Sequence, residues 1–218
     1  MPNGPQPPEA WLEDRASLLP AEAERDGGPA PTDDDLVRAA AGGEERAFEI
    51  LLSRHESTVL RVLRLLGVRA ADREDVAQEV FLRVFRYLGA FRPGRPFGGW
   101  IYRITVNASH DYHNRLGRRR RDEAEWREDL EETAAYAGGA LRDEDLDLRR
   151  RLLAGLAVLT ERERAVFVLC EIEGLATREV ARALGITRIT VRRHLGRARR
   201  SLQVELGSGS SPKKTSDD

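Results

Sequence analysis

Residues 175–200 read LATREVARALGITRITVRRHLGRARR, which is the pattern of two helices separated by a tight turn. Gly185 stands at the break between them, where a sharp turn requires a positive φ angle. In the second segment Val191, Leu195 and Ala198 recur at the spacing of one helix face. The stretch therefore predicts a helix-turn-helix, although a generic basic helical hairpin would share much of this pattern.

The outward face of the second predicted helix is basic. Its arginines fall between the apolar positions, and they are Arg188, Arg192, Arg193, Arg197, Arg199 and Arg200. A helix of this size fits the major groove of DNA, and guanidinium groups bind phosphate and guanine in a bidentate manner. Only two of the 36 basic residues in the chain are lysines, which suits DNA but is also what a GC-rich genome would produce.

Apolar residues spaced by three or four predict further helices on the N-terminal side. We expect these helices over about 33–41, 44–66, 71–88 and 97–115, with a Pro- and Gly-rich loop over 89–96. A helix ending before Thr160 is expected next, and Thr160 with Glu163 forms a capping box for another that runs to Gly174. The two helices of the helix-turn-helix follow, over about 177–184 and 188–206.

The charges are segregated along the chain, although the net charge is only -1. Residues 33–121 carry 17 basic and 12 acidic side chains and residues 148–206 carry 13 and 6, whereas residues 122–147 carry 2 and 11. We therefore predict an all-α protein, in which two small helical domains over 33–121 and 148–206 are joined by a flexible acidic linker over 122–147. The Pro-rich arm 1–32 and the tail 207–218 are predicted to be disordered.

Several functional classes are disfavoured by what the sequence lacks. No apolar run approaches the roughly 18 residues needed to span a bilayer, and the N-terminus lacks a signal-peptide pattern. The single Cys170 excludes an internal disulfide and a cysteine-rich metal site. No P-loop, dinucleotide-binding glycine motif or paired-histidine metal motif is present. We expect a cytoplasmic, nucleoid-associated protein that is not an enzyme and needs no metal or cofactor.

Both predicted domains resemble those of one family. Residues 152–202, with the run LTERERAVFVLCEIEGLATREVARALGITRITVRRHLGRARRSL, resemble region 4 of extracytoplasmic-function sigma factors in the sigma-70 family. The stretches DREDVAQEVFLRVFRYL and FGGWIYRITVNASHDYHNR resemble the family's regions 2.2 and 2.3–2.4. The resemblance covers residues 33–115 and 148–203. It implies a factor that binds core RNA polymerase and directs promoter-specific transcription initiation through the -10 and -35 elements.

The resemblance implies that the region 2.2 helix binds the β′ subunit of RNA polymerase. The matching positions are Asp72, Asp75, Gln78, Glu79 and Phe81. Asp75 and Glu79 are four residues apart and share a helix face with Asp72, so they suit a basic partner. Taken without the resemblance, the same residues would indicate a solvated acidic face favoured by the helix dipole.

The resemblance implies that the 2.3–2.4 helix and the preceding loop recognise and melt the -10 element. The predicted contact residues are Arg92, Arg95, Trp100, Tyr102, Arg103, Ile104, Asn107, Asp111, Arg115 and Arg118. Asn107 matches the residue that helps relatives hold a flipped base, and its amide pairs a donor with an acceptor. Core packing is an alternative role for Trp100 and Ile104, as an internal structural contact is for Asp111.

In region 4, the resemblance implies contacts between the last helix and the -35 element. The predicted contact residues are Arg188, Thr190, Arg192, Arg193, His194 and Arg197. Two positions depart from the family, because His194 replaces a frequent arginine and Ile189 a common glycine. His194 also fits a simple surface position.

The implied partners are core RNA polymerase, through its β′ and β subunits, promoter DNA and an anti-sigma protein. The acidic linker is implied to enter the path of the nascent RNA, or it serves only as a solubilising tether. A different class of protein remains open, namely a helix-turn-helix regulator that binds duplex DNA without joining the polymerase.

Overall fold

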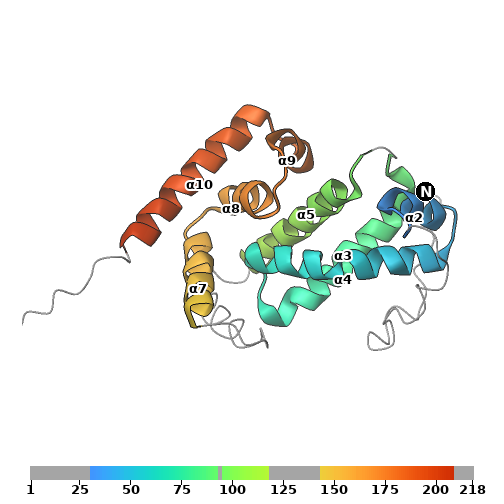
Figure 1. Cartoon of the computed structure of the whole chain (residues 1–218), viewed down its shortest axis with the longest axis horizontal. Coiled ribbons are helices and arrows are strands. Elements are labelled where there is room, and N and C mark those ends of the chain that lie inside the picture. The colour runs from blue at the N-terminus through green and yellow to red at the C-terminus, as the bar shows by residue number, and fades with distance from the viewer. Residues whose placement is uncertain (1–29, 93–94, 118–142, 209–218) are drawn as a thin grey trace, which may run out of the picture.

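The computed structural model describes residues 30–92, 95–117 and 143–208, and this part consists of helices and turns without a strand (Figure 1). The all-α prediction is therefore confirmed for these residues. The helices are α2 (Asp33–Ala41), α3 (Glu45–Leu65), α4 (Ala70–Tyr87), α5 (Phe97–Gly117), α7 (Asp143–Ala157), α8 (Glu161–Phe167), α9 (Thr177–Leu184) and α10 (Arg188–Ser208). None of the helices in these ranges is long and apolar enough to cross a membrane.

Helices α2 to α5 form the first group, and their apolar faces meet in one core. Leu63 of α3, Val80 of α4 and Ile101 of α5 are at most 2% exposed, so these three helices enclose the centre of that core. A 3-10 turn, Leu88–Ala90, follows α4 and leads into the loop before α5. The predicted helix bounds of this group agree with the structure to within two residues.

Helices α7 to α10 form the second group, and their local signals are those expected. Thr160 caps α8, because its hydroxyl accepts a hydrogen bond from the Glu163 N–H while the Glu163 carboxylate accepts one from the Thr160 N–H. Gly185 ends α9 with a φ of 64°, as the tight turn requires. Thr187 caps the start of α10, since its Oγ1 accepts a hydrogen bond of 3.1 Å from the Thr190 N–H.

Two details of the second group differ from the prediction. Helix α7 begins at Asp143, inside the stretch that we assigned to the linker. Its C-terminal half is held by Leu153 and Leu156, which are 2% and 0% exposed, so packing stabilises a helix whose start is highly charged. In addition, α8 ends at Phe167 and a π-helical turn, Val168–Ile172, continues to the loop, where sequence periodicity predicts one uninterrupted helix.

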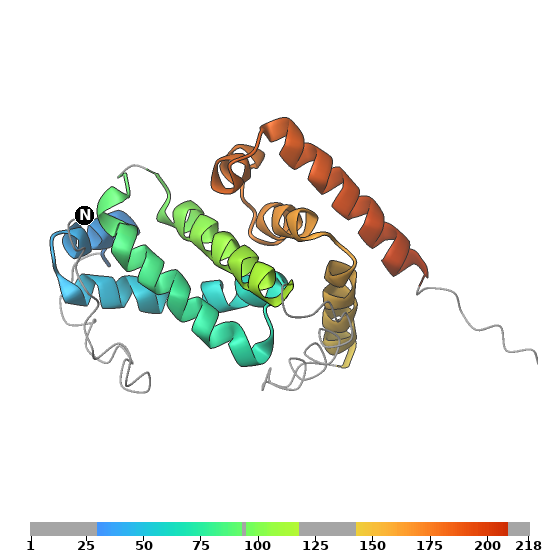
Figure 2. The same cartoon turned by 180° about the vertical axis from the view of Figure 1, so that it is seen from behind.

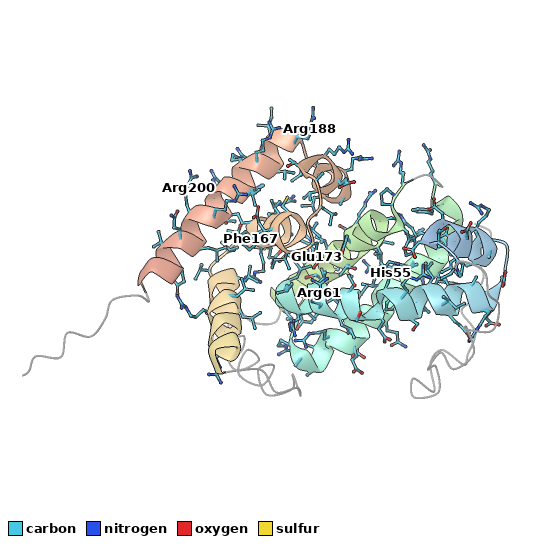
Figure 3. The ribbon with its side chains drawn as sticks, viewed as in Figure 1. His55, Arg61, Phe167, Glu173, Arg188 and Arg200 are labelled. Atoms are coloured by element: carbon cyan, nitrogen blue, oxygen red, sulfur yellow. The ribbon has the colours of Figure 1, made fainter. Side chains whose placement is uncertain are left out.

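The two groups pack against each other, which the sequence did not predict. Figures 1 and 2 show α9 and α8 beside α5 from both sides, with α7 near the end of α3. Val62, Leu65 and Leu66, at the end of α3, join a core with Leu156 and Val168 of the second group. Figure 3 shows Arg61 of the first group next to Glu173 of the second at this junction.

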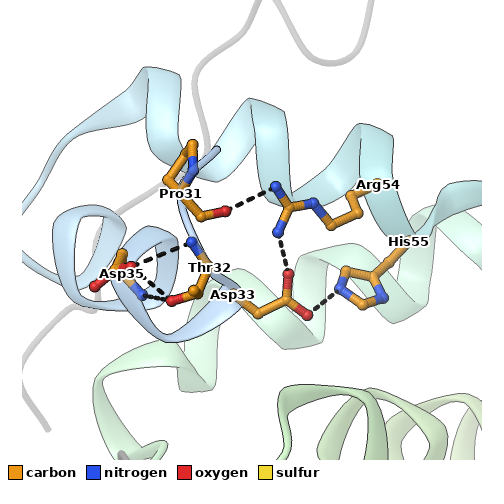
Figure 4. Close-up of polar contacts among 6 residues, drawn as sticks. All are labelled: Pro31, Thr32, Asp33, Asp35, Arg54 and His55. Carbon is orange, nitrogen blue, oxygen red and sulfur yellow. Dashed lines mark hydrogen bonds and ion pairs between the residues drawn. The ribbon is translucent and has the colours of Figure 1, made fainter. Parts of the chain in front are cut away.

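Helix α2 is fixed to α3 by polar contacts at its first turn (Figure 4). Asp33 accepts a hydrogen bond from the Arg54 guanidinium, and its second carboxylate oxygen lies 2.9 Å from His55 Nε2. Thr32 caps the helix through a reciprocal pair of hydrogen bonds with Asp35, which lower the pKa of the Asp35 carboxyl. The acidic residues of this first turn therefore have two roles, because Asp35 takes part in the cap of α2 and Asp33 ties the helix to α3.

Candidate nucleic-acid interface

Helix α10 presents an exposed row of arginines. Arg188, Arg192, Arg193 and Arg197 are exposed, whereas Val191 and Ala198 on the opposite side are 0% exposed. Figure 3 shows Arg188 at the outer end of α10 and Arg200 further along it. The predicted -35 arginines thus lie on one accessible helix, with their guanidinium groups exposed to the solvent.

His194 has a different environment from the arginines around it. Its side chain is half-buried, and its Nδ1 is buried without a hydrogen-bond partner. Burial lowers the pKa of His194, and the neighbouring charge of Arg193 lowers it further. Of the predicted -35 residues, His194 is therefore the one with a buried ring nitrogen, and its surroundings favour the neutral imidazole.

Helix α5 carries the predicted -10 residues on two of its faces. Arg103, Asn107 and Arg115 are exposed, and so are Arg92 and Arg95 in the preceding loop. By contrast, Ile104 is only 8% exposed and belongs to the core. Arg118 lies outside the described residues.

Trp100 packs in an aromatic cluster at the start of α5. Its ring centroid lies 5.3 Å from that of Phe91 and 5.6 Å from that of Phe97. The indole is only partly buried, so one side of it remains at the surface. Packing thus holds Trp100 in a fixed position at the edge of the exposed basic face.

Tyr102 is held by a residue of the second group of helices. Its hydroxyl donates a hydrogen bond of 2.6 Å to Glu173, whose other oxygen accepts from the Arg61 guanidinium. The Glu173 side chain is 2% exposed, while that of Arg61 is 39% exposed. Burial raises the pKa of Tyr102, and so does the hydrogen bond to Glu173. A predicted -10 residue is therefore occupied by an internal contact in this structure.

A second polar contact between the groups is made by Arg164 of α8. Its guanidinium donates hydrogen bonds of 2.8 Å and 3.1 Å to the carbonyls of Leu156 and Leu159, and one of 3.2 Å to the carbonyl of Leu66. Burial lowers the pKa of Arg164 to about 10. His113 Nε2 lies 3.0 Å from the same Leu66 carbonyl, so two side chains converge on the end of α3.

A cavity of about 450 Å³ lies between α5 and α9. Arg92, Arg95 and Arg103 line it from the first group, and Arg182 lines it from α9. Glu173 and Glu179 are the acidic residues in its wall. The cavity is therefore a mainly basic recess at the predicted -10 surface, which suits an anionic ligand.

Helix α4 carries the predicted polymerase-binding residues, which lie in three kinds of environment. Asp75 is exposed and Gln78 half-buried, while Phe81 is 9% exposed and packs in the core of the first group. Asp72 accepts a hydrogen bond of 2.7 Å from the Tyr112 hydroxyl, and burial with this bond raises the pKa of Tyr112 to about 12. In this structure Asp75 is the most accessible acidic member of the set.

Ion pairs of Arg83 with two carboxylates connect α4 to α5. Arg83 contacts Glu79 and Asp111, each at an N–O distance of 2.8 Å. Glu79 was predicted to bind the polymerase and Asp111 to contact the -10 element. In this structure both carboxylates instead form ion pairs with Arg83 within the protein. The internal role considered for Asp111 matches this placement.

Sequence reasoning missed three residues that join the two groups, namely Arg61, Arg164 and Glu173. Arg61 and Glu173 are 112 positions apart, and no spacing rule links such residues. The capping box did indicate where α8 begins, but not that Arg164 would be buried. Only the three-dimensional packing shows these contacts.

Comparison with known proteins matches both groups of helices to one family. Residues 51–119 match the family model for sigma-70 region 2, and residues 149–202 match that for sigma-70 region 4. The RNA polymerase sigma factor CnrH of Cupriavidus metallidurans is 34% identical over 192 residues, which cover 84% of this chain and 98% of CnrH. The ECF RNA polymerase sigma factor SigE of Mycolicibacterium smegmatis is 35% identical over 83% of this chain and 72% of its own length.

A solved structure shows the same fold. CnrH in complex with the cytosolic domain of CnrY has a TM-score of 0.61 and 30% identity, over 82% of this chain and 99% of CnrH. The resemblance seen in the sequence is thus confirmed by relatives matched along most of their length. The chain belongs to the ECF sigma factors of the sigma-70 family.

Proposed function

We propose that the chain binds core RNA polymerase and reads two promoter elements with two separate helices, α5 at the -10 element and α10 at the -35 element. As an ECF sigma factor, it directs promoter-specific transcription initiation. The observation that supports the division of labour is the pair of exposed basic faces, Arg103 and Arg115 on α5 and Arg192 and Arg193 on α10. Both faces offer guanidinium groups for phosphates and base edges.

For the -35 element we assign direct contacts to the exposed side chains of α10. These are Arg188, Arg192, Arg193 and Arg197, whereas the half-buried Thr190 at the helix start is engaged with Thr187 in the helix cap. The half-buried His194 is assigned a supporting position against α8. We assign the N-terminal half of α10 to the major groove, because the N-terminal residues of the second helix of a helix-turn-helix contact base edges.

For the -10 element we assign Asn107 and Arg103 to the single strand and Arg92 and Arg95 to phosphates. Trp100 supplies a rigid aromatic surface for stacking beside them. Tyr102 joins this set only after its contact with Glu173 is released. Ile104 supports α5 from within the core rather than touching DNA.

Partners follow from the family and from the surfaces described. We propose that α4 binds the β′ subunit through Asp75 and its neighbours, while region 4 contacts the β subunit. A regulator that joins duplex DNA alone would not need the region 2 helices, so this alternative is not favoured. CnrH is known in a complex with the cytosolic domain of CnrY, and we propose that an anti-sigma protein likewise binds this chain. We also propose that the chain itself acts at the nucleoid.

Run-off transcription tests the proposed function. Core RNA polymerase is supplied with the full chain and with promoters selected from a genomic library by the holoenzyme. We expect transcripts that start at defined positions and require the chain. Equal transcription with and without the chain on every selected template would refute the proposal.

Charge reversal in Asp75→Arg should weaken binding to core polymerase about fivefold, because a basic partner would then meet a like charge. Glu45→Arg reverses an exposed charge on α3 and is the matched control. Affinity for core enzyme is measured by fluorescence anisotropy of the labelled chain. Equal losses in the two variants would remove α4 from the polymerase interface.

Acidification should destabilise the folded chain through His113, whose Nε2 lies 3.0 Å from the Leu66 carbonyl at the end of α3. Burial lowers the pKa of His113, so its folded value lies below the usual 6.5. The stabilisation is therefore complete above a pH of about 6.5 and is lost as the pH falls through the lower folded pKa. The hydrogen bond to Leu66 and the charge of Glu161 raise the pKa of His113 and so oppose this effect, whereas Arg164 and His110 add to it.

Urea unfolding at pH 7.5 and pH 5.5 measures this effect. The wild-type midpoint should fall more on acidification than that of His113→Gln, whose amide can still donate to the Leu66 carbonyl. Parallel shifts in both proteins would show that His113 does not contribute to the pH dependence.

A further inference from the structure

Ile189 is an exposed apolar residue that the fold does not use. It is the second residue of α10, and it is 76% exposed, more than Val204 at 72% or Tyr87 at 52%. A β-branched side chain also lowers helix propensity slightly, because its χ1 angle is restricted in a helix. Neither core packing nor helix formation therefore accounts for isoleucine at this position.

The surroundings of Ile189 are cationic. Arg192 and Arg193 follow it by three and four residues, so they lie on the same side of the helix, and both are exposed. Arg188 precedes it and is exposed as well. The apolar side chain is thus bordered by guanidinium groups on the face of α10 that is turned away from the buried Val191.

Thr190, the next residue, lies differently. Its Oγ1 is 2.8 Å from that of Thr187, and its backbone N–H donates to the same Thr187 oxygen, so its polar atoms belong to the helix cap. At this end of α10, Thr190 and Thr187 therefore contact each other within the protein, whereas the side chain of Ile189 is exposed. A partner that receives Ile189 must combine negative charge with an apolar group.

The major groove of DNA has this combination of features. Phosphates border the groove, and the C5 methyl group of thymine is the apolar group on its base edges. We propose that Ile189 contacts a thymine methyl group in the -35 element and makes the chain prefer an A·T pair there. This inference rests on the proposed function of α10 as the -35 helix, and it assigns a specificity-determining role to a residue outside the arginine row.

Deoxyuridine substitution tests the contact, because it removes only the methyl group. The wild-type holoenzyme first selects duplexes from a library randomised over the -35 element. Each selected thymine is then replaced by deoxyuridine, and binding is measured for wild type, Ile189→Ala and the control Val204→Ala. Val204 is exposed on the same helix, 15 positions away along the sequence, so the control removes a comparable apolar side chain.

We expect deoxyuridine at one position to weaken wild-type and Val204→Ala binding roughly three- to fivefold, the effect of one methyl group. Ile189→Ala should bind the thymine duplex that much more weakly and be insensitive to the substitution. An element without a preferred A·T pair, or equal sensitivity in wild type and Ile189→Ala, would overturn the inference while leaving -35 recognition intact. Failure of the wild-type holoenzyme to select any element would instead reject the proposed function, and the inference with it.

Discussion

Replacing Arg164 with methionine should lower the free energy of unfolding by about 3 kcal/mol. The guanidinium satisfies carbonyls at the ends of two helices, Leu156 in α7 and Leu66 in α3, and the residue is 9% exposed. Methionine fills much of the same space but donates no hydrogen bond, and a buried acceptor left without a donor costs about 1–3 kcal/mol. Because several carbonyls share this donor, the effect exceeds that of an ordinary surface change.

Arg162→Met is the matched control, since Arg162 is exposed on the same helix. Urea unfolding provides the free energy, the midpoint and the slope for both variants. We expect the control to stay within about 0.5 kcal/mol of wild type. If Arg164→Met were equally stable, the carbonyl contacts would have no net energetic importance.

A second large effect is expected from Glu173→Ala, which should strengthen binding of the free chain to single-stranded -10 DNA roughly ten- to thirtyfold. Glu173 holds Tyr102 and Arg61, and α9 lies along α5, so the predicted -10 surface is partly covered. Affinity falls by the fraction of molecules that are competent to bind. Removing a buried carboxylate that joins the two groups raises that fraction.

Glu171→Ala is the matched control for this experiment. Glu171 lies two residues earlier and pairs with Arg199 at 2.7 Å, a contact within the second group alone. Anisotropy of a labelled oligonucleotide gives the affinities. Equal affinities of the Glu173 and Glu171 variants would show that the contact with Tyr102 does not restrain the -10 surface.

The sequence allowed the helices to be predicted well because their signals are local. The Thr160 cap and the positive φ at Gly185 each depend on a few neighbouring residues, and each occurs as predicted. The π-helical turn after Phe167 was missed, since apolar periodicity does not distinguish an α-helix from a short π-helical segment.

The burial and contacts of the predicted DNA-binding residues were harder to predict than the helices. Exposed arginines on α10 follow from the position of Val191 and Ala198 on the inner face, so that surface was within reach of sequence analysis. The partial burial of His194 and the hydrogen bond from Tyr102 to Glu173 depend on contacts between segments that are separated in the sequence. Charge and spacing carry no information about such contacts.

The apolar junction at the end of α3 has a thermodynamic consequence. Val62 and Leu66 share a buried cluster with Leu156 and Val168, so separating the two groups of helices would expose apolar surface to water. Such exposure raises the heat capacity, whereas burial at a binding interface lowers it. If the two groups separate when the chain binds polymerase, the apolar surface exposed at the junction offsets part of the apolar surface buried at the new interface. Calorimetry of this binding would then report a heat-capacity change less negative than the area of the new interface alone predicts.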